Sequence, residues 1–171
     1  NGAGIDIVTR EQIHSRQYFD QGGAMNYEGS TLDSWNNGTY YNLLDADVRS
    51  QIVQVTVRGF YGNIVRNVFT LSSPEVGQAQ SSAGSLLPYF TDNTTRIAYL
   101  NGGASDWWLR DTYGYNRVFY VTSSGGVSWV LSQNQFGARP SFCLPAAMLF
   151  SGSPNADGSY SPVGSPYMDS V

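Results

Sequence analysis

The spacing of apolar residues changes near Val53, and this change limits the fold more than any other feature of the sequence. Before this point, residues such as Leu32 and Trp35 recur at helical spacing. After it, Val55 and Val57 alternate with polar residues, as in a half-buried strand. The pattern predicts an α+β domain, with short helices in the N-terminal third followed by a mostly antiparallel sheet with long loops.

Three short helices are expected before the change in spacing. Ser30 or Thr31 can cap the first helix, and Asp45 can cap the third, because their side-chain oxygens accept from unpaired backbone N–H groups. The Asn-Asn-Gly run at 36–38 is expected to interrupt the helical pattern. The second and third helices are then expected to cover 39–44 and 46–52.

Most of the later segments resemble strands. The run Ser123-Ser124-Gly125-Gly126 indicates a hairpin, and Pro140 implies a strand edge, a bulge or a strand start. One further short helix is expected at Pro74-Glu75, because proline at the first helical position and an acid in the first turn favour a helix start. The expected strands are 67–71, 106–110, 117–122, 127–131 and 136–144.

The length of 171 residues suits one domain. We expect this domain to cover residues 1–150, with 151–171 as an extended C-terminal arm of the same unit. Because the sequence begins with Asn1 rather than Met, we expect it to be a processed product or a piece of a longer protein.

The ionisable residues exclude several kinds of chemistry. All nine basic residues are arginine, so Schiff-base and phosphate-loop lysines are absent. One cysteine, Cys143, excludes internal disulfides and cysteine-cluster zinc sites, and one histidine, His14, excludes histidine-rich metal sites. The net charge of −4 is a poor match for nucleic acid. We therefore expect no enzyme activity, no cofactor, no metal and no nucleic-acid or membrane partner.

Two weaker patterns leave alternatives open. A pair of carboxylates suitable for glycoside hydrolysis could come from the acidic residues near the N-terminus, and an Asp-Gly sequence near the C-terminus faintly resembles a calcium loop. Solvated acids and an ordinary turn are the preferred interpretations. The residues concerned are Asp6, Glu11, Asp20 and Glu28 for the first pattern, and Asn155, Asp157 and Gly158 for the second.

Large aromatic residues crowd into 107–129, with amide and arginine side chains among them. Alternate side chains of a strand face opposite ways, so part of this set fills the core while the rest faces solvent. Tyr and Trp combine a rigid contact face with a polar group, which suits a binding surface. The candidate ligand-binding residues are Tyr113, Tyr115, Asn116, Trp129 and Asn134, and the first three are expected in a turn.

Two arginines in apolar segments, Arg110 and Arg139, are candidate structural residues. Each guanidinium has five donors that can join loop carbonyls and carboxylates. Trp108 and Pro140 beside them complete the set of candidate structural residues.

Several short motifs, in this order and spacing, are similar to those of a family of undefined function found in secreted proteins of Gram-positive bacteria and in phage structural proteins. The resemblance covers roughly residues 5–150. The motifs are Ser15–Tyr18, Tyr27–Trp35 with Asn37, Tyr40–Asn42, Asp47–Ile52, Val68–Ser72, Trp107-Trp108-Leu109-Arg110 and Gly137-Ala138-Arg139-Pro140.

That family resembles the C-type-lectin-like fold, in which two strands bracket a variable segment that carries the ligand surface. The resemblance implies a twisted, mostly antiparallel sheet, with Trp108–Arg110 and Gly137–Arg139 as the brackets. Asp111-Thr112 replaces the usual Ser-Pro after the first bracket. The Glu-Pro-Asn and Gln-Pro-Asp motifs of calcium-dependent lectins are absent, and so is the cysteine pair of formylglycine-generating enzymes.

These observations together predict a non-catalytic recognition domain on a virion surface or outside a bacterial cell. It would bind a host-surface glycan or protein, and form a homo-oligomer among neighbouring structural subunits. The alternative is a structural virion domain without a ligand, in which the arm 151–171 grips an adjacent subunit.

Overall fold

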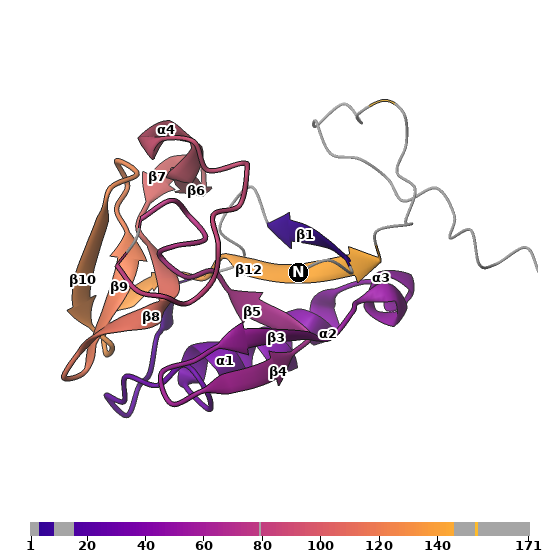
Figure 1. Ribbon diagram of the computed structural model, residues 1–171, viewed down its shortest axis with the longest axis horizontal. Helices are drawn as coiled ribbons and strands as arrows, with labels where there is room; N and C mark the ends of the chain where they lie inside the picture. The colour runs from indigo at the N-terminus through magenta and orange to yellow at the C-terminus, as the bar shows by residue number, and fades with distance from the viewer. Residues whose placement is uncertain (1–3, 9–15, 79, 146–152, 154–171) are drawn as a thin grey trace, which may run out of the picture.

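The computed structural model describes residues 4–8, 16–78, 80–145 and 153, which form the α+β fold that the sequence predicts (Figure 1). Apart from one parallel pair, β8 with β11, the strand pairs of this described part are antiparallel. A five-stranded sheet lies at one end of the molecule with α4 beside it, and a three-stranded sheet and the helix α3 lie toward the other end.

The five-stranded sheet has the strand order β10-β9-β8-β11-β2. Consecutive hairpins join β8 to β9 and β9 to β10, and β11 returns to lie on the other side of β8. Its strands are β2 (Arg16–Tyr18), β8 (Trp107–Gly114), β9 (Arg117–Val121), β10 (Val127–Leu131) and β11 (Gln135–Gly137). The first long strand is longer than expected, because it continues past Arg110 as far as Gly114.

The three-stranded sheet joins distant parts of the chain in the order β1-β12-β5. Its central strand begins at Pro140, where the missing N–H of proline disturbs the ladder least. Two separate two-stranded ribbons complete the sheet structure. The strands are β1 (Gly4–Val8), β5 (Val68–Thr70) and β12 (Pro140–Pro145), with β3 (Val55–Arg58) paired to β4 (Asn63–Arg66) and β6 (Ala98–Leu100) paired to β7 (Gly103–Ser105).

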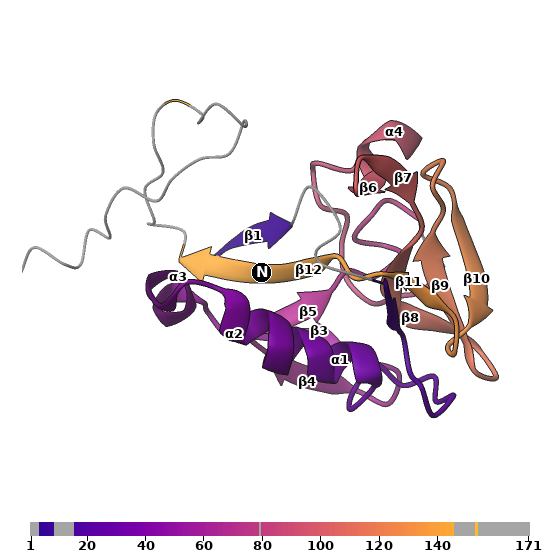
Figure 2. The same cartoon turned by 180° about the vertical axis from the view of Figure 1, so that it is seen from behind.

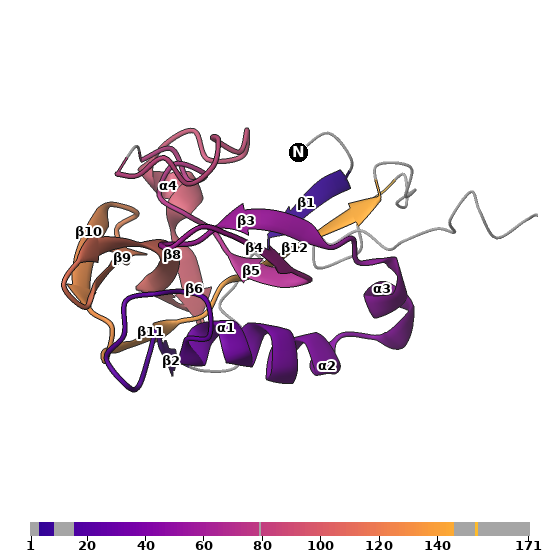
Figure 3. The ribbon, with the colours of Figure 1, turned by 60° about the horizontal axis from the view of Figure 1, so that its bottom comes forward.

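The first helices form one row alongside β5 and the β3–β4 ribbon (Figure 2). Figure 3 shows that the row begins beside β2 and β11 and runs away from the five-stranded sheet toward α3. The elements are α1 (Thr31–Trp35), the π-helical segment η1 (Asn36–Tyr40), α2 (Tyr41–Leu43), α3 (Ala46–Gln51) and, later in the chain, α4 (Asn93–Arg96). Ser30 and Asp45 cap α1 and α3, as the sequence predicts.

The expected interruption at 36–38 is wrong, because the chain stays helical there as a π-helical turn. Asn36 Nδ2 donates to Thr70 Oγ1 at 2.9 Å, and Asn37 both donates to Val68 O at 2.9 Å and accepts from its N at 3.2 Å. These bonds attach the helix to β5, so the asparagines contribute to packing instead of ending the helix.

The helix expected at Pro74-Glu75 is also absent, because residues 73–77 form a turn. The carboxylate of Glu75 reaches back to accept from Ser72 N at 2.9 Å and also pairs with Arg110. This tertiary ion pair fixes the segment as a turn, which local helix signals do not reveal.

The main core lies between the five-stranded sheet, α1 and the β3–β4 ribbon. Trp107 and Trp108 of β8 are fully buried in it, together with Phe19 and Tyr27 from the N-terminal loops. The indole N–H of Trp108 donates to Gln17 O at 2.7 Å, so this large side chain is buried without an unpaired donor. A smaller cluster around Val68 and Phe142 packs beneath the helical row.

Candidate functional site

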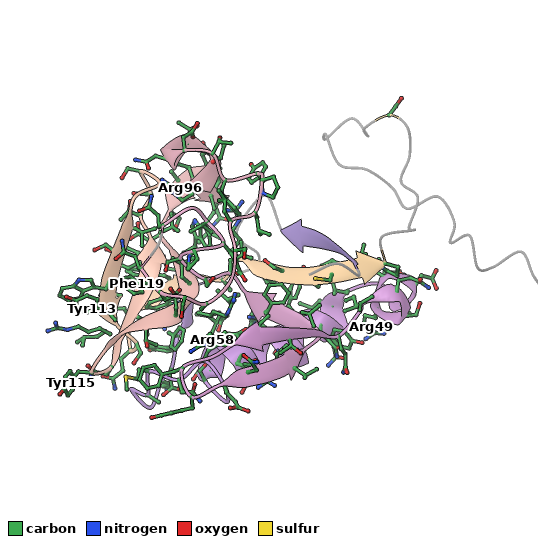
Figure 4. The ribbon with its side chains drawn as sticks, in the orientation of Figure 1. Arg49, Arg58, Arg96, Tyr113, Tyr115 and Phe119 are labelled. Atoms are coloured by element: carbon green, nitrogen blue, oxygen red, sulfur yellow. The ribbon has the colours of Figure 1, made fainter. Side chains whose placement is uncertain are left out.

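Exposed aromatic side chains gather where β8, β9 and β10 form the outer part of the five-stranded sheet. Figure 4 places Tyr113 and Tyr115 at this end of the molecule. Tyr115 is 94% exposed, Tyr113 57% and Trp129 42%, whereas a typical core aromatic is almost fully covered. We call Tyr113, Tyr115, Asn116, Arg117 and Trp129 the hairpin surface.

Tyr113 and Trp129 come from strands that are not neighbours, and their rings meet across β9. Their centroids lie 5.1 Å apart with an angle of 10° between the planes, which is a stacked arrangement. Phe119 supports the pair from β9, with its ring edge-on to Tyr113 at 5.8 Å. Tyr113 lies on β8, whereas the sequence predicts it in a turn.

Arg117 adds a cation to this stack. Its guanidinium carbon lies 4.3 Å from the centre of a Trp129 ring, within the range of cation–π attraction. Arg117 is exposed, so its charge remains available at the surface. The result is a rigid platform of two rings with a positive group at its margin.

Tyr115 and Asn116 form the two-residue turn between β8 and β9, which Gly114 and Arg117 close as a pair. Both turn residues have left-handed backbones, with φ of 43° and 56°. These angles are typical of the tight turn that suits a hairpin, where Asn-Gly is the favoured sequence. A tyrosine is uncommon in this conformation, so the turn presents its ring to solvent at some conformational cost.

Asn134 lies in the turn between β10 and β11, next to the hairpin surface. Its Nδ2 donates to Leu131 O at 3.1 Å, and Ser132 N of the same turn donates to Asn116 O at 2.9 Å. The structure thus brings the two turns together. The side-chain amide of Asn134 bonds within its own turn, so Asn134 stabilises the turn that contacts the hairpin surface.

Arg110 is buried, with 2% of its surface exposed. All five of its N–H groups have acceptors: two go to Glu75 at 2.6 and 2.7 Å, and three go to the carbonyl oxygens of Thr70, Ala83 and Arg58 at 2.8–3.1 Å. One side chain therefore ties β8 to β3, β5 and the loop around Ala83.

Arg139 is buried by a different set of neighbours. Its guanidinium carbon lies 4.7 Å from a Trp107 ring centre and 5.4 Å from that of Phe90. Burial lowers the pKa of Arg139 to about 10, while a hydrogen bond with Tyr89 and the charge of that phenol act in the opposite direction. Pro140 follows it as the first residue of β12.

Sequence reasoning missed two members of these clusters. The sequence indicates Arg117 only as one of the polar residues among the aromatics of 107–129, although its position two residues before Phe119 places both on one face of β9. Glu75 predicts a helix start, and nothing in the neighbouring sequence indicates that its partner is Arg110, thirty-five residues later.

The remaining candidates divide between described and undescribed residues. Asp20 accepts from Ala24 N at 2.7 Å and from Thr31 N at 3.2 Å, which fixes a loop, and Glu28 is exposed. His14, Glu11, the side chain of Asp6, and Asn155, Asp157 and Gly158 lie outside the described residues. Within the described ranges, no three His, Cys, Asp or Glu side chains gather as a metal site, and no helix is long and apolar enough to cross a membrane.

Comparison with known proteins assigns the chain to a family. Searches of curated proteins and of solved structures gave no match. The family model described as Domain of unknown function (DUF6273) matches residues 4–146, which include both sheets, the helical row and the hairpin surface. Because this match covers most of the 171 residues, the chain belongs to the DUF6273 family.

Proposed function

We propose that this chain is a non-catalytic recognition domain with a C-type-lectin-like fold, and that the hairpin surface binds a glycan or protein on a host cell. It would act on a phage particle or outside a bacterial cell, in an assembly that contains several copies. The observation that carries the proposal is the stacked Tyr113–Trp129 platform beside the fully exposed Tyr115.

The placement of the two bracketing segments supports the fold. Trp107 of β8 pairs with Gly137 of β11 in the one parallel pair between these strands, and Gly137 N donates to Asp106 O at 2.9 Å. The chain between them therefore leaves the fold and returns to it at neighbouring points. That intervening segment carries every residue of the hairpin surface.

The chemistry of the surface supports a saccharide as the bound molecule. The faces of sugar rings offer C–H groups that pack on aromatic rings, while their hydroxyl groups need directed hydrogen bonds. Tyr115 supplies an exposed ring, and Asn116 and Arg117 supply nearby donors. A single site of this kind binds weakly, so useful attachment requires several copies engaging together.

The test is to display the domain in many copies on a bead and to measure attachment to Gram-positive cells and to an array of their surface saccharides. Tyr113→Ala combined with Tyr115→Ala should abolish attachment while the domain stays folded, with a melting temperature lowered only by the loss of the Tyr113 ring contacts. Tyr99→Ala removes an exposed tyrosine of β6, outside the hairpin surface, and should attach as the parent does.

Arg139→Ala provides the opposite comparison, because it removes a buried cation from between two aromatic rings and should lower the melting temperature sharply. If the tyrosine double variant attaches normally, the hairpin surface is not the binding site. If the parent domain attaches to no cell and no saccharide, the structural alternative replaces this proposal.

A further inference from the structure

A groove of about 580 Å³ lies away from the hairpin surface, between the β3–β4 ribbon and residues 84–88. Its volume falls within the range of small-molecule sites in proteins. The ion pair of Arg110 with Glu75 lies at the groove, so its lining is anchored to the core. Thr56, Arg58 and Asn63 line one side, and Leu86, Leu87 and Pro88 line the other.

The two sides of the groove differ in chemistry. Leu86 is 56% exposed, although leucine is a residue that folding normally buries, and it stands beside the partly covered Leu87. Opposite them stand Thr56, Asn63 and Arg58, whose side chains end in a hydroxyl, an amide and a guanidinium. An occupant that satisfies both sides has an apolar body and a polar end.

The charged residues of the groove determine which charge the polar end of an occupant should carry. Arg110 and Glu75 neutralise each other at 2.6 Å. Arg58 is exposed, and its guanidinium makes no ion pair or hydrogen bond with any residue in the described part of the chain. Arg58 also lines a second cavity, of about 270 Å³, together with Asp111, whose carboxylate accepts from the N–H and the hydroxyl of Ser73 and makes no ion pair with Arg58. The charged residues that line the groove itself, Arg58, Arg110 and Glu75, sum to one positive charge.

We propose that this groove binds a small monocarboxylate with an apolar body, in which the carboxylate pairs with Arg58 and the body packs on Leu86 and Leu87. A carboxylate matches the planar donor pair of a guanidinium, and its single negative charge balances the single positive charge of the groove. Figure 4 shows Arg58 well apart from Tyr113 and Tyr115, so this site is separate from the hairpin surface.

The experiment follows backbone amide resonances of the full chain during titration with 3-phenylpropionate. The neutral analogue 3-phenylpropanamide and phenyl phosphate are titrated in the same way. Saturable shifts are expected for the amides of Asn63, Leu86 and Leu87 with the carboxylate, and weaker binding by about tenfold or more with the neutral analogue, because a charge-assisted hydrogen bond is lost.

Variants test whether Arg58 binds the carboxylate and whether Leu86 contacts the apolar body. Arg58→Gln should weaken the carboxylate about tenfold and leave the neutral analogue unchanged, whereas Leu86→Ala should weaken both. Arg49→Gln, which removes a cation on α3, should change neither. Equal binding of the carboxylate and the neutral analogue, full binding by Arg58→Gln, or no saturable shift at the groove would overturn the proposal. Tighter binding of phenyl phosphate would overturn the choice of a carboxylate. None of these outcomes depends on whether the hairpin surface binds a glycan.

Discussion

Arg110 donates one Nη group to each carboxylate oxygen of Glu75, at 2.6 and 2.7 Å. The pair joins the middle of β8 to the turn at 73–77, two segments thirty-five residues apart in the sequence. Three backbone carbonyls use the remaining N–H groups of the guanidinium. Because the Arg110 side chain is buried and all of its N–H groups are bonded, its removal leaves the Glu75 carboxylate and three carbonyl oxygens without hydrogen-bond donors.

Arg110→Lys should therefore destabilise the fold although it keeps the charge. An ammonium has three donors and cannot replace five bonds in a planar arrangement. We expect a loss of about 3 kcal/mol in the free energy of unfolding, measured by urea denaturation. Arg49→Gln on α3 should stay within about 0.5 kcal/mol of the parent. A lysine variant as stable as the parent would show that the bidentate pair is not structural.

Gly84 approaches the side chain of Glu75 so closely that any larger residue there would have to displace it. A Cβ there would lie 2.5 Å from Glu75 Oε1, and its φ is +126°. Gly84→Ala should lose about 2 kcal/mol or more, because backbone strain and displacement of Glu75 add together.

Gly102 of the β6–β7 turn gives the matched comparison for this substitution. Its φ is +80°, and nothing lies within 4 Å of a Cβ there. Gly102→Ala should therefore cost only the backbone strain, about 1 kcal/mol. Equal losses for the two alanine variants in urea denaturation would mean that Glu75 yields without cost.

Stability should fall above pH 10 because of two buried tyrosines. Burial raises the pKa of Tyr27 and of Tyr40 to about 12. Such a phenol keeps its proton in the folded state, so its contribution is complete below pH 10 and is lost as pH rises toward 12. Each contributes a loss of about 1.4 kcal/mol by pH 11. Arg139 acts in the opposite direction, because burial lowers its folded pKa to about 10, below its unfolded value.

Tyr40→Phe tests this balance. It removes one titrating phenol, so the loss of unfolding free energy between pH 8 and pH 11 should be about 1.4 kcal/mol smaller in the variant than in the parent. Urea denaturation at several pH values measures both slopes. Parallel curves for the parent and the variant would show that Tyr40 does not carry the pH dependence.

The sequence predicts the local features of this fold well, because local chemistry determines them. Ser30 and Asp45 cap helices as expected, and the run at 123–126 joins β9 to β10. The wrong predictions concern segments whose structure depends on contacts between residues far apart in the sequence. The sequence predicts that Asn37 interrupts a helix, but its amide bonds to β5 and the helix continues. The sequence predicts a helix start at Glu75, but its carboxylate pairs with Arg110.

In the candidate site, too, the sequence predicts features that depend on neighbouring residues and misses those that depend on long-range contacts. Exposure of Tyr115 follows from its place in a hairpin turn, which short-range patterns can indicate. The stacking of Tyr113 on Trp129 depends on the order of β8, β9 and β10 and on side chains that lean across the middle strand. The groove depends on segments 56–63 and 84–88, which approach each other only in the folded chain.

The most direct test of the central claim is Tyr115→Gly, assayed for both stability and binding on the saccharide array. Glycine adopts a φ of 43° without the strain of a tyrosine, so the melting temperature should stay the same or rise. Binding should be lost, because the exposed ring at the tip of the hairpin is gone. Loss of binding with unchanged or higher stability is the result that the account predicts, whereas full binding by Tyr115→Gly would contradict it.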